Sequence, residues 1–114
     1  MKNLLLNLLL LVACISCSSP RLEHEQKSGN SNVVKTGKAF HVNLPEDHTT
    51  PYLWSLSNNY NSTLVNYMGS LFHSNEKGVD FNFEALKPGK TDLTFYLRSY
   101  NDTSDIKTFT VEIK

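Results

Sequence analysis

The chain has 114 residues and a mass of 12.9 kDa, which is room for a single domain. Hydrophobic residues make up 39% of it and charged residues 19%, so a disordered polyelectrolyte is excluded. The 11 Lys and Arg balance the 11 Asp and Glu, and this neutrality argues against nucleic acid as a partner. Two Cys are too few for a disulfide scaffold.

The first 13 residues are predicted to be a signal peptide. Lys2 provides a positive start, and a Leu-rich apolar run of about 10 residues follows it. A membrane-spanning helix needs roughly 20 apolar residues, so the run is typical of a secretory signal instead. It ends in Leu11-Val12-Ala13-Cys14, which resembles a bacterial lipobox. The resemblance implies cleavage before Cys14 and lipidation of its thiol. Lipidation at Cys17, or an ordinary cut near residue 13 or 16, are the alternatives.

Residues 14–32 are predicted to be a flexible tether, because they are polar and lack apolar periodicity. Removal of residues 1–13 leaves 10 basic and 11 acidic residues, a net charge of −1. A lipid on Cys14 would hold the domain at a membrane surface without a spanning segment. We therefore expect a location in the cell envelope, on the outer membrane or facing the periplasm, or secretion where the chain is not lipidated.

From residue 33 to residue 114 the apolar residues recur at every second position. The clearest run places Val79, Phe81, Phe83 and Ala85 between polar residues, and residues 40–44, 52–56, 93–97 and 109–113 repeat the pattern. Such alternation is typical of strands with one buried face. Turn signals such as Pro88-Gly89 separate the runs. Residues 64–72 are less clear, because Gly69 interrupts them. The pattern predicts an all-β sandwich with Trp54 in its core.

The domain shows no catalytic constellation. It holds His41, His48 and His73 without Cys, and no metal-ligand spacing is present. We expect His41 on a solvated strand face and His73 in a loop. Asp80 and Glu84 would lie about 13 Å apart along one strand, too far for a carboxylate pair. The sequence therefore predicts a binding module that is not an enzyme and that uses no cofactor or metal.

Three segments, in order, carry a more specific pattern. The first, residues 44–54, resembles the hallmark loop of the chagasin family of cysteine-protease inhibitors, which has Leu-Pro, then Asn-Pro-Thr-Thr-Gly, then an aromatic, any residue and Trp. The positions that fit are Leu44, Pro45, Thr49, Thr50, Tyr52 and Trp54. The positions that depart are Asp47, His48 and Pro51, where the family has Asn, Pro and Gly.

The other two segments lie further along the chain. Residues 78–89 resemble the family strand that follows a glycine-rich loop, here about residues 74–78. Residues 96–100 resemble the family's Tyr-x-Arg-Pro-Trp, with Arg98 matching and with Ser99 and Tyr100 in place of Pro and Trp. Residues 107–113 resemble the family's last strand, so the resemblance covers the whole domain.

The resemblance implies an immunoglobulin-like β-sandwich of about seven strands, with three loops at one end. In the family these loops form a wedge that enters the cleft of papain-like proteases and is not cleaved. The residues expected to bind the protease are Asp47, His48, Thr49, Thr50 and Pro51, then Glu76, Lys77 and Gly78, then Arg98, Ser99 and Tyr100. The implied partner is a papain-like cysteine protease, and we expect the inhibitor to be a monomer.

Other interpretations stay open at this point. The domain can instead be an immunoglobulin-like envelope module for adhesion, binding a glycan or another protein, because a fold does not imply a function. The Thr49-Thr50 segment can be a simple turn into a core strand, and Arg98 can pair with Asp92 or Asp102 at the surface. A hydrolytic enzyme has the least support, since no nucleophile and base are evident.

Overall fold

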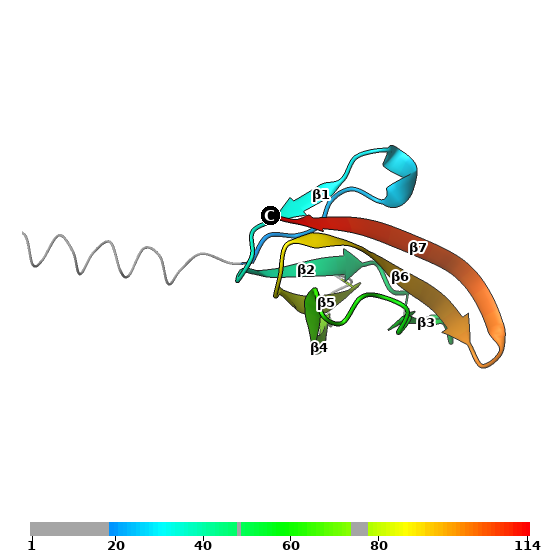
Figure 1. Ribbon diagram of the computed structural model, residues 1–114. Helices are drawn as coiled ribbons and strands as arrows, with labels where there is room; N and C mark the ends of the chain where they lie inside the picture. Colours follow the sequence, from blue (N-terminus) through cyan, green and yellow to red (C-terminus); the bar gives the residue numbers. More distant parts are fainter. Residues whose placement is uncertain (1–18, 48, 74–77) are drawn as a thin grey trace, which may run out of the picture.

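The computed structural model describes residues 19–47, 49–73 and 78–114, which form two β-sheets packed face to face (Figure 1). One sheet has the order β1-β7-β6-β3, with bounds Asn32–Val34, Asp102–Ile113, Gly89–Ser99 and Leu53–Leu56. The other has the order β2-β5-β4, with bounds Ala39–Leu44, Gly78–Ala85 and Val65–His73. A 3-10 helix, η1, spans Gln26–Ser28. The predicted all-β sandwich of about seven strands is confirmed.

The alternating apolar residues meet between the two sheets. Phe81, Phe83 and Ala85 of β5 are buried, as are Leu93 and Phe95 of β6. The rings of Phe81 and Phe95 lie 4.8 Å apart between centroids and join the sheets across the core. Aromatic pairs at this spacing add to the stabilisation that burial of their area provides. The predicted strand pattern is therefore confirmed for these strands. Among the described residues, no helix is long and apolar enough to cross a membrane.

The stretch around Gly69, which the sequence left unclear, is the nine-residue strand β4. Its pairing with β5 shifts between Tyr67 and Gly69, where Gly69 adopts φ +106°. A bulge of this kind breaks the two-residue period, which is why the alternation is hard to recognise. His73 is the last residue of β4 and not part of a loop, so this expectation is wrong.

The described part of the expected tether, residues 19–32, packs on the sandwich. Leu22 is only 6% exposed and belongs to the core. Its N–H donates to the carbonyl of His41 at 2.9 Å, and the N–H of His41 donates to the carbonyl of Pro20 at 3.0 Å. The Asn32 amide is buried and donates to the carbonyl of Thr110 at 3.0 Å. The folded part therefore includes residues well before position 33. The sequence did not indicate this, because a single buried Leu in a polar segment leaves no periodic pattern.

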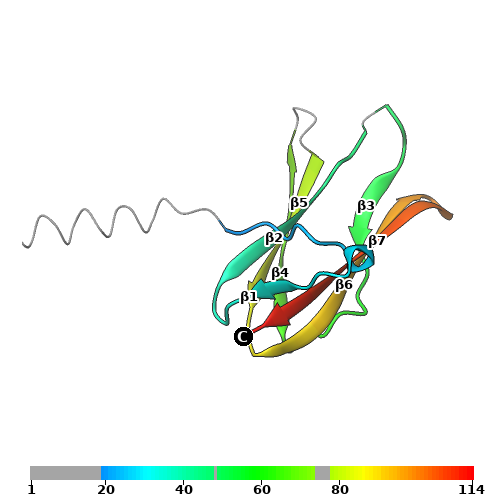
Figure 2. The same cartoon turned by 90° about the horizontal axis from the view of Figure 1, so that it is seen from above.

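The sandwich has two ends, which we call the tip and the base. At the tip, the β2–β3 loop lies beside the ends of β4 and β5 that flank residues 74–77 (Figure 2). The β6–β7 hairpin also turns at the tip. At the base, the β1–β2 and β5–β6 turns lie together, since the N–H of Gly37 donates to the carbonyl of Ala85 at 2.8 Å. The β2–β3 loop, the start of β5 at Gly78 and the β6–β7 hairpin are therefore at one end, whereas residues 85–89 of the second segment lie at the base.

Candidate functional site

The β2–β3 loop is folded on itself by hydrogen bonds to Asp47. The Asp47 carboxylate accepts bonds from the N–H of Thr49 at 2.9 Å and from the Thr49 hydroxyl at 2.7 Å. The Asp47 carbonyl accepts the Thr50 hydroxyl at 3.1 Å. An Asp side chain commonly closes a turn in this way. Both Thr residues and Pro51 remain exposed, so the loop presents them in a defined shape.

Trp54, which follows the β2–β3 loop, is bonded to the residues at the start of that loop. The Trp54 side chain is 7% exposed, as expected of a core residue, and its indole N–H donates to the carbonyl of Pro45 at 2.7 Å. The backbone N–H of Trp54 donates to the Glu46 carboxylate at 3.1 Å. Glu46 was not predicted as a site residue, because the sequence around an acidic loop residue does not reveal a hydrogen-bond partner eight positions away. The loop and Leu97 together surround a hollow of about 440 Å³.

Gly78 brings the start of β5 against the start of the β2–β3 loop. Gly78 is buried and adopts φ +79°, a backbone conformation that favours glycine. A Cβ atom at this position would lie 2.1 Å from the carbonyl oxygen of Leu44 and 3.0 Å from the Cα of Pro45. No other residue fits here without a backbone shift, so Gly78 sets how closely these two parts of the tip approach.

A side-chain hydrogen bond joins the β6–β7 hairpin to the β2–β3 loop. The hydroxyl of Tyr52 donates to the carboxylate of Asp102. This hydrogen bond, with smaller effects of burial and of the negative charge, raises the pKa of Tyr52 above 10.0. Tyr52 is neutral in the physiological range, where it acts as the donor. Asp102 was considered only as a partner of Arg98, so this role was not predicted.

The apex of the hairpin presents Tyr100, whose side chain is 99% exposed. Tyr100 has φ +53°, which is uncommon for a residue other than glycine and is a form of backbone strain found at functional sites. Arg98 lies over the ring of Tyr96 at 4.4 Å and its Nε–H donates to Thr103 at 3.1 Å. Arg98 therefore contacts Tyr96 and Thr103, and not Asp92 or Asp102 as the alternative interpretation had it.

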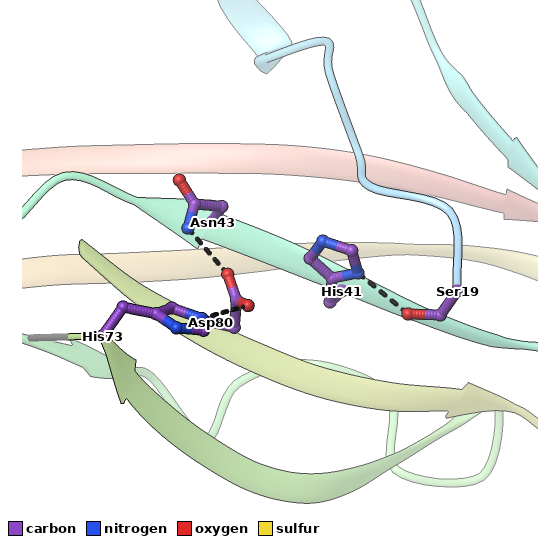
Figure 3. A network of polar contacts seen from close by, with 5 residues as sticks. All are labelled: Ser19, His41, Asn43, His73 and Asp80. Carbon is purple, nitrogen blue, oxygen red and sulfur yellow. Dashed lines mark hydrogen bonds and ion pairs between the residues drawn. The ribbon is translucent and has the colours of Figure 1, made fainter. Parts of the chain in front are cut away.

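A polar network lies on the outer face of the β2-β5-β4 sheet, next to the ends of β4 and β5 (Figure 3). The Asp80 carboxylate accepts the Asn43 amide at 2.7 Å and contacts the ring of His73 at 2.7 Å. Burial alone would raise the pKa of Asp80. The bonds from Asn43 and His73, with the charges of His41 and His73, outweigh that effect and lower the pKa below 3.8. His41 is partly buried rather than solvated, and its ring bonds to Ser19 at 2.9 Å.

Eight of the residues expected to bind a protease are described, and all lie at the tip: Asp47, Thr49, Thr50, Pro51, Gly78, Arg98, Ser99 and Tyr100. His48, Glu76 and Lys77, and the expected lipidation site Cys14, lie outside the described residues. The role of each of these residues stays a prediction. In the described part of the chain, no group of three His, Cys, Asp or Glu is placed to hold a metal ion.

Residues 33–113 match the family model described as "Chagasin family peptidase inhibitor I42". The chain belongs to this family. The expected family is thereby confirmed, and so is the prediction that the chain is an inhibitor and not an enzyme.

Solved structures similar to this inhibitor include the following two. One is the crystal structure of the cysteine protease inhibitor EhICP2 from Entamoeba histolytica, with a TM-score of 0.65, 12% identity, and coverage of 83% of this chain and 92% of that chain. The other is the solution structure of Amebosin, with a TM-score of 0.51, 14% identity, and coverage of 85% and 98%. At these identities the similarity shows the fold. A search of curated proteins finds no significant match.

Proposed function

We propose that the chain inhibits papain-like cysteine proteases by inserting its tip into the active-site cleft. The observation that carries the proposal is the joining of three segments at one end. Gly78 packs against the start of the β2–β3 loop, and Tyr52 bonds to Asp102 of the β6–β7 hairpin. One rigid surface therefore presents the Thr pair beside the hairpin apex.

The exposed groups suit a narrow polar cleft lined by a Cys and a His. Thr49 and Thr50 are small, and their hydroxyls are already oriented by bonds to Asp47. Tyr100 and Arg98 supply an aromatic anchor and a multidentate donor, which are the residue types that dominate binding energy at interfaces. Because the loop is ordered by its own hydrogen bonds, little conformational entropy is lost on binding. A wedge of this shape fills a cleft without placing a peptide bond at the nucleophile.

A titration of papain with the chain tests the proposal. We expect stoichiometric loss of activity, and we expect Thr50→Asp to abolish it, because a carboxylate would be desolvated without a partner in the cleft. Thr36→Asp, the same change at an exposed position of the base, serves as the control and should inhibit normally. Normal inhibition by Thr50→Asp, or by a chain lacking residues 47–51, would contradict the role of this loop. Failure to inhibit a panel of papain-like proteases at micromolar concentration would favour an adhesion module.

We also propose that a lipid on Cys14 anchors the inhibitor to a bacterial membrane, in the cell envelope. The support is the sequence Leu11-Val12-Ala13-Cys14 after an apolar run of about 10 residues. Mass spectrometry of the N-terminal peptide from membranes tests this directly. We expect a diacylglyceryl thioether on Cys14, and we expect Cys14→Ser to release the protein from membranes while Cys17→Ser does not. An unmodified N-terminus after residue 13 or 16 would contradict the anchor.

A further inference from the structure

Five exposed lysines gather at the base, the end opposite the tip. They lie on the β1–β2 turn, on the β5–β6 turn with the first residues of β6, and after β7: Lys35, Lys38, Lys87, Lys90 and Lys114. Backbone bonds hold these three segments side by side. The N–H of Ala85 donates to the carbonyl of Lys38 at 2.9 Å, and the N–H of Lys114 donates to the carbonyl of Val34 at 2.9 Å. The lysines are therefore neighbours in space although they are spread over 80 positions of the chain.

The positive charge of the base is only partly neutralised by nearby acidic side chains. Two acidic side chains share this end, Glu84 opposite Ala39 and Glu112 opposite Lys90, which leaves an excess of three positive side chains. Lys114 lies 3.9 Å from Glu112, and the described residues give the other four lysines no ion pair. Residues 19–114 as a whole carry 10 basic and 11 acidic residues. The excess of lysines at the base is thus a local feature of a chain with net charge −1.

The chain enters the domain toward the same end. A parallel bridge between Arg21 and His41 carries the N-terminal segment along β2 in the direction of that strand, and Ser19 lies toward the base end of β2 (Figures 1 and 3). Cys14 precedes Ser19 by five residues, which span at most about 18 Å when fully extended. A lipid at Cys14 therefore holds the membrane surface close to the lysine-rich end.

We propose that the base of the sandwich docks on the anionic phospholipid surface of the membrane and directs the tip away from it. Lysines near an anionic surface are each attracted to it, and a cluster of them is a recognised membrane-binding signal. Leu86, 40% exposed beside Lys87, gives the same turn an apolar group that can enter the headgroup region. The membrane is assigned as the partner of the base because of the proposed lipid anchor, on which this inference rests. Docking of the unlipidated domain is nevertheless measured independently of both the anchor and protease inhibition.

Vesicle sedimentation of residues 19–114 tests the proposal. This piece contains all seven strands and the whole core from Leu22 to Ile113, so it is expected to fold as the domain does. We expect binding to phosphatidylglycerol vesicles at millimolar lipid, none to phosphatidylcholine vesicles, and loss of binding in high salt. Lys87→Gln and Lys90→Gln should each lower the partition coefficient about fivefold. Lys27→Gln on η1 removes the same charge away from the base and should leave it unchanged.

A second measurement reports the orientation. In Leu86→Trp the new indole should be quenched by brominated phospholipid, whereas in Leu53→Trp, at an exposed position of β3 near the tip, it should not. Equal quenching of both variants would overturn the proposed orientation.

Other results also decide the matter. No binding to anionic vesicles, or an equal loss of binding in Lys27→Gln, would overturn the proposal that the base is the docking face. Salt-sensitive self-association without lipid, lost in Lys87→Gln, would instead assign the base to a contact with a second copy of the chain.

Discussion

The hydroxyl of Tyr52 donates a hydrogen bond to the carboxylate of Asp102, which lies 50 residues further along the chain. Tyr52 belongs to the β2–β3 loop and Asp102 begins β7, so this contact joins two of the three segments of the tip. The neutral phenol is stabilised by the bond, as the raised pKa of Tyr52 indicates. The contribution of this hydrogen bond to the stability of the folded state is therefore present below pH 10 and is lost as the pH rises through the raised pKa.

Tyr52→Phe removes this contact and keeps the ring. We expect inhibition to weaken about threefold to tenfold, because the loop and the hairpin must then be ordered when the protease binds. The inhibition constant measures the effect. Tyr60→Phe makes the same chemical change in the β3–β4 connection, away from the tip, and should inhibit normally. An unchanged constant for Tyr52→Phe would show that the two segments do not act as one surface.

Asp47→Ala should disorder the turn that presents the Thr pair. The variant loses the acceptor of the N–H and hydroxyl of Thr49, and we expect about a tenfold weaker inhibition with a faster dissociation rate. Asp47→Asn keeps a carbonyl oxygen in the same place and should recover most of the affinity. Stopped-flow dissociation rates would distinguish the two variants. If the Asn variant were as weak as the Ala variant, the charge of Asp47 and not its turn would be the important feature.

Gly78→Ala should destabilise the domain and weaken inhibition together. The added methyl group would clash with the Leu44 carbonyl, and we expect a loss of more than about 2 kcal/mol in the free energy of unfolding. Gly37→Ala is the matched control, because Gly37 also has a positive φ, +84°, but has open space around it. Its loss should be about 1 kcal/mol. Urea unfolding measures both, and equal losses would show that close packing at Gly78 is unimportant.

Asp80→Asn should change how stability depends on acid. The pKa of Asp80 is lowered in the folded state, so its contribution is present above about pH 4 and is lost as the pH falls below 3.8. The stability difference between the native protein and the variant should therefore shrink between pH 5 and pH 2. Asp92→Asn removes one charge from the other sheet and controls for the change in net charge. A difference that stays constant across this range would contradict the role of Asn43 and His73 as partners of Asp80.

The fold could be predicted where the two-residue alternation of apolar and polar residues is uninterrupted. Phe81 and Phe83 alternate with polar residues because β5 is the central strand of its sheet, with the core on one face. Prediction was harder at Gly69, where a bulge changes the period, and at Leu22, a single buried residue in a polar segment. Both features depend on a partner strand, which a local pattern does not contain.

The candidate site was located by the order of three segments, not by their chemistry. Thr49, Gly78 and Arg98 were named in advance, and so was Asp47, which holds Thr49. The supporting roles of Glu46 and Asp102 were not predicted. Glu46 and Asp102 act through hydrogen bonds to residues that the fold brings near, and an isolated acid in a loop gives no indication of its partner. The supporting residues of a surface therefore require coordinates, whereas its exposed residues can be inferred from resemblance.

The route of the N-terminal segment has a mechanical consequence. Residues 20–22 bond to His41 in one sheet, and β1 then pairs in parallel with β7 in the other. Tension applied to the chain at Ser19 acts along β2, so it loads the two bonds at His41 in shear and at the same time, instead of peeling them one after another. A pull from the N-terminus therefore acts on the two bonds at His41 before it reaches the pairing of β1 with β7.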